Sequence, residues 1–388
     1  MRELDEFELR KFVAPEFVFG FEARKLAGRY AKNFGARKVL VVTDAGVMAA
    51  GWTDDAIGYL RSEGIEYAVF DGVTSNPKAA EVEFGADFYH KEGCNAIVAV
   101  GGGSPMDCAK GIGIVCTNQK SIVEFEGVDQ VEFPIPPLIC IPTTAGSSAD
   151  VSQFAIITDT LKRSKFAIIS KMVVPDVALI DPLTTTTMDA ALTASTGVDA
   201  LCHAIEAYVS TAHSPITDLH ALQAIALVTS SLVRTIRKPD DVLLRGRMML
   251  ASLEAGLAFS NASLGAVHAM AHSLGGLLDC AHGECNAILL SHVIAFNFEF
   301  AQERYVEIGR AMGLESGGVA PEKALSALRA ELARLSQAAG TSYSLSQLGV
   351  SRGDIPGLAE RAMSDPCIFT NPRQPTLKEL EAIYEQAF

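Results

Sequence analysis

The chain has 388 residues, of which 49% are hydrophobic and 20% charged, and its formal net charge is -14 at pH 7. This length is typical of two or more domains, and the hydrophobic content is high enough for large buried cores, which excludes a disordered chain. The negative charge argues against nucleic acid as a partner, because a phosphate backbone needs a basic surface.

The beginning of the chain predicts neither export nor membrane insertion. Residues 1–12 alternate charged and apolar residues and lack the apolar core of a secretory signal. No stretch of about 18 uninterrupted apolar residues indicates a membrane span. The eight cysteines form no C-x-x-C pair, which is typical of an enzyme with reduced thiols. We therefore expect a cytoplasmic protein without a membrane partner.

In the first half of the chain, short apolar segments alternate with helical patterns. Nearly continuous apolar strands separated by helices are typical of buried parallel strands in an α/β layer. Residues 154–159 and 165–170 could instead form a hairpin. The predicted strands lie at residues 36–44, 65–73, 94–103, 137–144, 154–159 and 176–182, and one clear helix lies at 79–93.

The strand at residues 94–103 ends in three glycines, followed by Ser104 and Pro105. Glycines let a phosphate approach the backbone, and the first N–H groups of the next helix form an anion site. We expect Ser104 to cap that helix, with Pro105 in its first turn. The G-x-G-x-x-G fingerprint is lacking, so the pattern is equally consistent with phosphate binding and with a tight turn that binds nothing.

Two other polar loops follow apolar strands. In IPTTAGSSAD at residues 141–150, the hydroxyls of Thr143, Thr144 and Ser147 could bind a nicotinamide, a ribose or a phosphate, or could satisfy their own loop. Asp44 follows the first predicted strand. Its carboxylate could accept hydrogen bonds from an adenosine ribose and repel a 2′-phosphate, or could form an Asx turn.

After residue 182 the pattern changes to one helix after another, without strand-like alternation. We place a boundary near residues 182–188, which gives an α/β domain at residues 1–185 and an all-helical domain at 186–388. The clearest helical segments lie at residues 196–210, 216–237, 241–259, 265–276 and 323–340.

Histidines gather in three segments of this second half. Asp199 and His203 are four residues apart, as are His268 and His272, so each pair lies on one face of a helix. A carboxylate among apolar neighbours must be paired or bound to a cation. His282 precedes a glycine, which suggests a loop at the end of a helix.

One carboxylate and three imidazoles suit Fe(II), Zn(II) or a similar divalent ion. For any single histidine, a satisfied place in the core is the alternative. The residues alone do not choose which three of the four histidines, His203, His268, His272 and His282, would bind the ion.

Six segments are specific in combination, order and spacing. They lie at 101–110 (GGGSPMDCAK), 141–146 (IPTTAG), 175–182 (PDVALIDP), 197–208 (GVDALCHAIEAY), 265–276 (GAVHAMAHSLGG) and 370–376 (TNPRQPT). Together they resemble the iron-containing, or group III, alcohol dehydrogenases over almost the whole chain. The resemblance implies a Rossmann-like nucleotide-binding domain followed by an all-helical metal-binding domain, an architecture similar to that of dehydroquinate synthase. It also implies reversible hydride transfer between NAD and a small primary alcohol or diol, with an aldehyde as product.

The resemblance also implies roles for single residues. The metal, Fe(II) with Zn(II) as the alternative, would be held by Asp199, His203, His268 and His282. His272 would then lie near the nicotinamide and relay a proton or orient the substrate. Asp44 matches the position at which the family favours NAD over NADP. The other implied cofactor contacts are Asn76, Gly102, Gly103, Ser104, Asp107, Thr143, Thr144, Ser147 and Lys165.

One departure from the family pattern concerns the cofactor loop. After TTAG the family usually has TGSEVT, whereas this chain has SSADVS, so Ser148 replaces a glycine and Asp150 replaces a glutamate. The local shape of the loop is therefore open, while all four implied metal ligands are present.

The sequence leaves other functions open. A polyol dehydrogenase, or a cyclase that uses NAD without net redox change, would have the same architecture. A sensor that binds nucleotide or metal without turnover is a further alternative. By analogy we expect a homo-oligomer, a dimer or larger, because an exposed strand near the N-terminus could pair across a two-fold axis.

Overall fold

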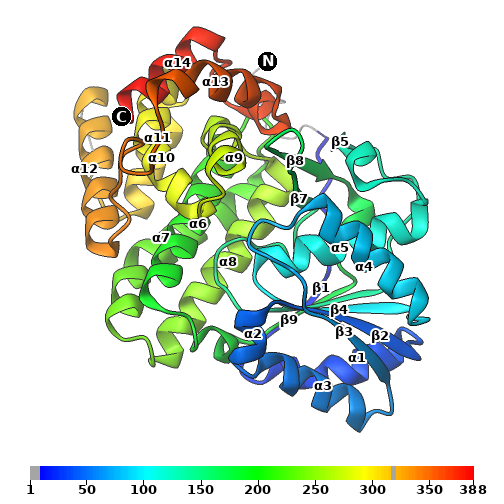
Figure 1. Cartoon of the computed structure of the whole chain (residues 1–388). Coiled ribbons are helices and arrows are strands. Elements are labelled where there is room, and N and C mark those ends of the chain that lie inside the picture. Colours follow the sequence, from blue (N-terminus) through cyan, green and yellow to red (C-terminus); the bar gives the residue numbers. More distant parts are fainter. Residues whose placement is uncertain (1–8, 316–319) are drawn as a thin grey trace. The chain divides into compact units, whose positions relative to one another are not determined.

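The computed structural model describes residues 9–315 and 320–388 (Figure 1). Two compact units are present, one of residues 13–188 and one in which residues 9–12 join residues 189–388. The first unit contains the predicted α/β layer and the second is helical, so the predicted fold class is confirmed. The division into a nucleotide-binding domain at residues 1–185 and a metal-binding domain at 186–388 stays a prediction.

A six-stranded sheet forms the centre of the α/β unit, and every neighbouring pair of strands in it is parallel. The strand order is β1-β9-β6-β4-β2-β3. The strands are β1 (Glu16–Phe19), β2 (Lys38–Val42), β3 (Glu66–Phe70), β4 (Ala96–Gly101), β6 (Leu138–Pro142) and β9 (Val177–Ile180).

Both faces of this sheet are covered, which explains the nearly continuous apolar strands. Successive side chains of a strand point to opposite faces. Accordingly, Val39 and Val41 of β2 pack into one hydrophobic core, and Leu40 and Val42 pack into the other. Figure 1 shows α1 (Ala27–Asn33) and α3 (Trp52–Ser62) on one face, and α4 (Ala79–Lys91) and α5 (Gly103–Asn118) on the other. The short α2 (Ala45–Ala49) follows β2.

Residues 154–169 form a hairpin outside this sheet, as the alternative interpretation of the sequence predicted. Strand β7 (Phe154–Asp159) pairs antiparallel with β8 (Ser164–Ile169), which also pairs with β5 (Gly127–Val128). The placement of residues 154–159 in the parallel layer was therefore wrong. A parallel partner would need a crossover of roughly a dozen residues, and residues 160–163 are too few for one.

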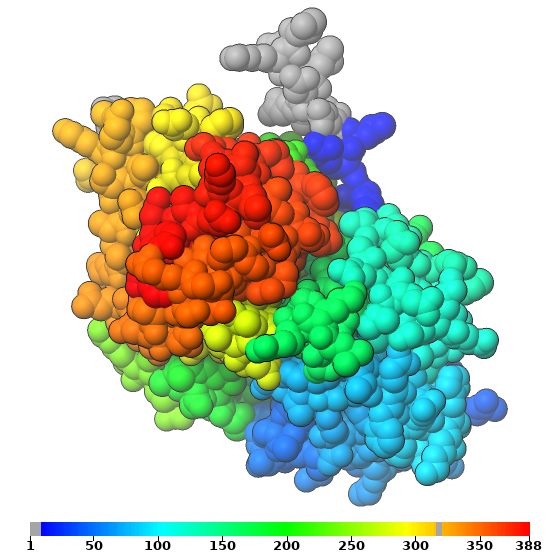
Figure 2. Space-filling view, turned by 45° about the horizontal axis from the view of Figure 1, so that its top comes forward, coloured from blue at the N-terminus to red at the C-terminus, as the bar shows by residue number. Residues whose placement is uncertain are grey.

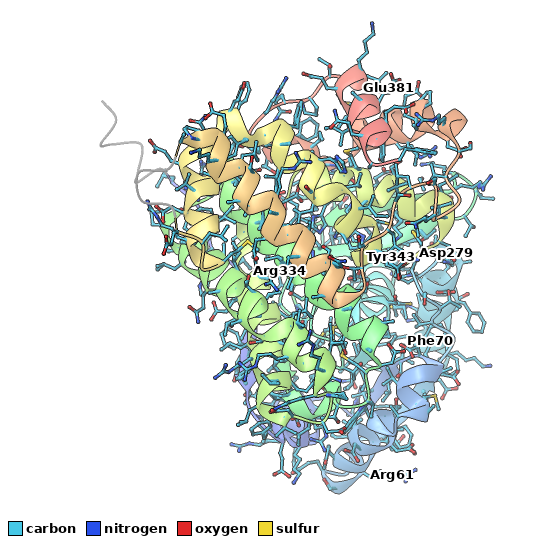
Figure 3. The ribbon with its side chains drawn as sticks, turned by 90° about the vertical axis from the view of Figure 1, so that its left-hand side faces the viewer. Arg61, Phe70, Asp279, Arg334, Tyr343 and Glu381 are labelled. Atoms are coloured by element: carbon cyan, nitrogen blue, oxygen red, sulfur yellow. The ribbon has the colours of Figure 1, made fainter. Side chains whose placement is uncertain are left out.

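The second unit is a bundle in which almost every residue of α6 is buried. Helix α6 packs against α7, α8 and α10, and α12 packs against α7, α10 and α11. Figure 3 shows α12 crossing the helices beneath it, with Arg334 labelled. Figure 2 shows the C-terminal residues, in orange and red, at the surface of this unit. The helices are α6 (Ala190–Val209), α7 (Pro215–Arg237), α8 (Val242–Ala262), α9 (Ala266–Leu278), α10 (His282–Asn297), α11 (Gln302–Ala311), α12 (Pro321–Ala339), α13 (Ile355–Ser364) and α14 (Leu377–Gln386).

Helix α7 is the one helix of the described residues that is long and apolar enough, by length and composition, to cross a membrane. Its buried residues include Ala221, Ile225 and Leu232. Helices α6 and α8 both pack against it. These contacts account for part of its apolar character, since 39% of its most apolar window is buried inside the structure.

Candidate metal centre and nucleotide loops

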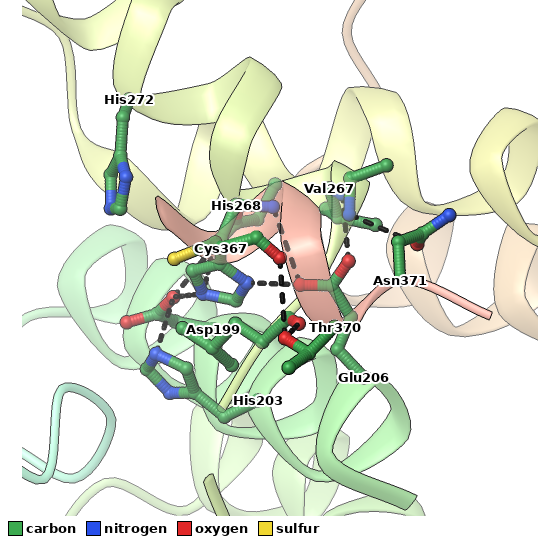
Figure 4. A network of polar contacts seen from close by, with 12 residues as sticks. Asp199, His203, Glu206, Val267, His268, His272, Cys367, Thr370 and Asn371 are labelled. Carbon is green, nitrogen blue, oxygen red and sulfur yellow. Dashed lines mark hydrogen bonds and ion pairs between the residues drawn. The ribbon is translucent and has the colours of Figure 1, made fainter. Parts of the chain in front are cut away.

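Helices α6, α9 and α10 bring four polar side chains together inside the helical unit. Asp199 and His203 lie one turn apart on α6, His268 lies on α9, and His282 is the first residue of α10. One ligand atom from each of these four residues lies within 4.8 Å of all the others. Figure 4 shows Asp199, His203 and His268 pointing toward one another.

Asp199 lies at the centre of this group. Its Oδ1 lies 3.9 Å from Nε2 of His203 and 3.8 Å from Nε2 of both His268 and His282. The rings of His203 and His268 stack with their centroids 4.5 Å apart. Three imidazole nitrogens therefore face a single carboxylate oxygen across a gap too long for direct hydrogen bonds.

The charges of this group suit a divalent cation. Asp199 and Glu206 are both buried, and within the described part of the chain neither forms an ion pair with a lysine or an arginine. Burial alone would raise the pKa of Asp199, but His203, His282 and His268 outweigh burial and lower it. Two buried carboxylates among neutral imidazoles would leave negative charge uncompensated, and a dication would balance it.

The pKa of His268 indicates the same need for positive charge. Burial alone would lower this pKa, whereas Asp199 and Glu206 outweigh burial and raise it to about 9. A cation on Nε2 would replace the proton there. Asn286 also contacts the group, since its Nδ2 donates to Asp199 Oδ1 over 2.7 Å and lies 3.2 Å from His268 Nε2. Its buried Oδ1 accepts no hydrogen bond from the residues that the structure describes. The residues present thus fit a divalent metal ion.

His282 does not stand in a loop at the end of a helix, as the sequence suggested, because it begins α10. The following Gly283 explains this placement. A Cβ at residue 283 would lie 2.1 Å from the carbonyl oxygen of Ser195, on α6. The glycine lets α10 start directly against α6, one turn before Asp199, and this contact brings His282 to the group.

We expect Gly283→Ala to separate these two helices. The added methyl group would destabilise the protein by about 1–3 kcal/mol, the usual range for overpacking, and would lower its metal content. Urea unfolding and metal analysis of the purified protein measure the two effects. Gly309→Ala is the control, because a Cβ there would meet Leu314 no closer than 3.7 Å. Equal metal content in both variants would contradict this role of Gly283.

His272 lies outside the group of four, in a second cluster with Asp365 and Cys367. Its Nδ1 lies 2.7 Å from Asp365 Oδ2, and Asp365 Oδ1 accepts the backbone N–H of Cys367 over 2.8 Å. Burial alone would raise the pKa of Asp365, but His272 and the hydrogen bonds outweigh burial and lower it. The ring of His272 stacks on that of His282 with centroids 5.2 Å apart. Because Nδ1 of His272 contacts Asp365, Nε2 is the ring nitrogen that a ligand could contact.

In the α/β unit, the glycine turn lies directly against the hydroxyl-rich loop at residues 141–150. A Cβ at Gly102 would lie 2.9 Å from Thr144, and a Cβ at Gly103 would lie 3.0 Å from Ser147. Thr143 donates its backbone N–H to Gly101. The two loops therefore form one surface, which larger residues at the glycines would push apart.

Ser104 does not cap α5, contrary to our expectation, because the N-cap is Gly102 and Ser104 lies within the helix. Its hydroxyl instead accepts the backbone N–H of Asn76 over 3.2 Å. Lys165 donates to Asn76 Oδ1 over 2.7 Å. Asp107 accepts the backbone N–H of Ile156, and burial raises its pKa to about 6. Asn76 thus links Ser104 to Lys165.

Asp44 and Ser148 both have a local structural role. Asp44 is the N-cap of α2 and accepts the backbone N–H of Val47 over 2.9 Å. This local hydrogen bond is the kind that the Asx-turn alternative predicted. Ser148, which replaces a glycine of the family pattern, has a φ of 51°. This left-handed conformation is one that glycine adopts easily, so the loop keeps the backbone shape that a glycine would favour.

Comparison with known proteins agrees with this geometry. Residues 14–182 match the model of iron-containing alcohol dehydrogenases, and residues 193–388 match the C-terminal domain of the same family. The chain belongs to the iron-containing alcohol dehydrogenase family. The family resemblance predicted from sequence is thereby confirmed.

Relatives of this alcohol dehydrogenase match it over at least 95% of its length. It is 42% identical to the 1,3-propanediol dehydrogenase of Klebsiella pneumoniae over 95% of this chain and 96% of the relative. It is 36% identical to the NAD-dependent methanol dehydrogenase of Bacillus methanolicus, over 97% and 99% of the two chains. A solved 1,3-propanediol oxidoreductase superposes with a TM-score of 0.95 at 41% identity, covering 98% of this chain and 100% of that one.

Several polar residues around the candidate metal centre were not predicted. Glu206 had a signal, because it follows Asp199 by seven residues and so lies on the same face of α6. Asn286 lies one turn after His282 on α10 and had a similar signal. Asp365 and Asn371 had none, since they lie far along the chain from the helix that they contact.

Proposed function

We propose that this alcohol dehydrogenase oxidises a small primary alcohol or diol to an aldehyde, reversibly, with NAD as the hydride acceptor. The observation that carries the proposal is the convergence of Asp199, His203, His268 and His282, with the buried carboxylate of Glu206 behind His268. The names of the relatives support the substrate class and the cofactor, because they act on 1,3-propanediol and methanol and one is NAD-dependent.

In this proposal Asp199, His203, His268 and His282 hold the metal, Fe(II) with Zn(II) as the alternative. The convergence of their ligand atoms supports this assignment. A divalent ion bound there supplies Lewis acidity, which makes the hydroxyl group of an alcohol easier to deprotonate, while NAD supplies the hydride chemistry. The helices supply a fixed, buried position for the donor atoms.

His272 is the proposed proton acceptor. Asp365 accepts the hydrogen bond of Nδ1, so the lone pair of Nε2 is available for a proton from the substrate or from a water. Asp365 thereby also fixes the orientation of the ring. The role is separable from metal binding, because His272 lies in a different cluster.

The glycine turn and the loops beside it form the proposed NAD site. Backbone N–H groups at the start of α5 suit the pyrophosphate, and the neighbouring hydroxyls and Lys165 suit its oxygens or the ribose. The contacts that Asn76, Gly102 and Gly103 make within this surface support the proposal. The full set of residues is Asp44, Asn76, Gly102, Gly103, Ser104, Asp107, Thr143, Thr144, Ser147 and Lys165.

We expect Asp44→Gly to relax the preference for NAD over NADP. The carboxylate would repel a 2′-phosphate, so its removal should raise kcat/KM for NADP relative to NAD by tenfold or more, about 1.4 kcal/mol. Stability should fall by only a few tenths of a kcal/mol, because glycine is an acceptable N-cap. Steady-state kinetics with both cofactors measures the ratio, and an unchanged ratio would remove Asp44 from cofactor selection.

NADH formation from a panel of primary alcohols, diols and polyols tests the proposal. We expect net NADH with primary alcohols or diols and lower rates with longer polyols. The fastest turnover with polyols would assign the chain to the polyol branch. Binding of NAD without net NADH on any alcohol, and without NADH consumption by any aldehyde, would favour a cyclase or a sensor.

We propose that the enzyme is cytoplasmic and forms a homo-oligomer. Its proposed binding partners are small-molecule alcohol and aldehyde substrates. Strand β1 lies at the edge of the sheet and exposes Phe17 and Phe19, which suits pairing with a second copy. Sedimentation of the purified protein checks the oligomer, and a monomer at micromolar concentration would contradict it.

A further inference from the structure

Glu206 connects the backbone of α9 to the ring of His268. It is 3% exposed and lies on α6, about two turns after Asp199. Its Oε2 lies 2.6 Å from His268 Nδ1, the ring nitrogen that faces away from Asp199. Figure 4 shows Glu206, His268 and Asp199 in a row, joined by dashed lines.

The same carboxylate caps the start of α9. Its Oε1 accepts the backbone N–H of Val267 over 2.7 Å, and Oε2 accepts that of His268 over 3.3 Å. The N-cap residue itself is Gly265, which has no side chain to serve these groups. A Cβ at Gly265 would lie 2.9 Å from Glu206 Oε1, so the glycine makes room for the carboxylate. An ionised glutamate at a helix N-terminus is also stabilised by the helix dipole.

These contacts determine which nitrogen of His268 carries the proton. Both oxygens of Glu206 accept backbone N–H bonds, and an ionised carboxylate is an acceptor only. His268 Nδ1 must therefore be the donor in the 2.6 Å contact. When a cation displaces the proton of Nε2, the proton on Nδ1 stays with Glu206. Nε2, which lies 3.8 Å from Asp199 Oδ1 and 3.2 Å from Asn286 Nδ2, is then the nitrogen left to bind the ion.

We propose that Glu206 is a positioning residue for the metal centre, one that fixes the tautomer of His268 and raises the basicity of its Nε2. This inference rests on the proposed metal site. A carboxylate behind a metal-binding imidazole typically contributes a factor of about 10–100 to metal affinity. Glu206 has the geometry for this role, and its charge adds to that of Asp199.

The test is the affinity of metal-stripped protein for Zn(II) alone, measured by competition with a chromophoric chelator. Glu206→Gln keeps the size of the side chain but replaces one acceptor oxygen with an NH2 donor. It therefore cannot serve both backbone N–H groups and the ring N–H together. We expect its Kd for Zn(II) to rise about 10–100-fold. A Kd within twofold of the wild-type value would overturn the inference.

Asn371→Ala is the matched control, since Asn371 contacts the same end of α9 without contacting the ring of His268. Its Oδ1 accepts the backbone N–H of Ala266 over 3.1 Å. We expect this variant to melt at a lower temperature but to bind Zn(II) with much less loss of affinity than Glu206→Gln. An equal loss in both variants would assign the effect to the placement of α9 and would overturn a specific role for Glu206.

Ring 15N NMR of the Zn(II)-loaded wild-type protein gives a second test that needs no variant. We expect His268 to carry its proton on Nδ1, and a proton on Nε2 would overturn the inference. If the wild-type protein bound no Zn(II) or Fe(II), the metal centre itself would fail and this inference with it. Metal binding by wild type with an unchanged Kd in Glu206→Gln would remove only the role of Glu206.

Discussion

His268→Ala should lose the bound metal and the alcohol dehydrogenase activity together. His268 is buried, and its Nε2 faces the same Asp199 oxygen as His203 and His282, so its removal takes one of the four donor atoms from the group. Lewis acid activation contributes several kcal/mol to the transition state. At 1.36 kcal/mol for each factor of ten, a loss of about 4 kcal/mol lowers kcat/KM roughly 10³-fold. Metal analysis and NADH formation measure the two effects.

His220→Ala provides the control for removal of a histidine. His220 also pairs with a glutamate between two helices, since its Nδ1 lies 2.5 Å from Glu254 Oε2. This variant should keep both metal and activity, although the lost packing lowers its stability somewhat. A His268→Ala protein that keeps its full metal content would contradict the ligand assignment.

His272→Ala should show the opposite pattern, with metal retained and turnover slowed. Its ring belongs to the cluster with Asp365 rather than to the group of four. Loss of a positioned general base typically lowers the rate about 10²–10⁴-fold. Single-turnover rates with an excess of NAD, together with the metal content of the same sample, separate chemistry from metal loss.

The pH profile distinguishes a proton acceptor from a residue that only shapes the pocket. Removal of the acceptor should change the pH dependence of kcat, whereas removal of packing alone should raise KM and leave the profile unchanged. If His272→Ala empties the metal site, the choice of His282 over His272 as the fourth ligand is wrong.

The α/β layer was predictable because a strand buried on both faces is apolar along its whole length. Strands β2, β4 and β6 were located within a few residues for this reason. Periodicity does not determine strand direction, however. The direction of β7 depends on its short link to β8, so the apolar pattern of residues 154–159 alone does not distinguish a hairpin strand from a strand of the parallel layer.

The group of Asp199, His203, His268 and His282 was partly predictable, because Asp199 and His203 lie only four residues apart on one helix. The spacing of Asp199 and His203 on one helix predicts that they lie on one face. It does not predict which other helices bring their histidines to that face. That depends on Gly283, whose missing side chain lets α10 pack against the backbone of α6. The family resemblance supplied His282, whereas physical reasoning from the spacing left all four histidines open.

Contacts made over long stretches of chain were beyond prediction. Asp365 lies 93 residues from His272, and Asn371 lies 105 residues from Ala266. Neither pair has a periodic or spacing signal. The TNPRQPT segment, which carried the resemblance only as a pattern, has a physical role here, since Asn371 fixes the first turn of the helix that bears His268.

The most direct test of the central claim is turnover by metal-stripped protein given back Fe(II) or Zn(II) under anaerobic conditions, with 1,3-propanediol and NAD as substrates. The metal-free protein should form no NADH. One equivalent of the correct ion should restore turnover in the wild-type protein and none in His268→Ala. Full NADH formation by the metal-free protein, or equal restoration in both proteins, would contradict a catalytic metal held by Asp199, His203, His268 and His282.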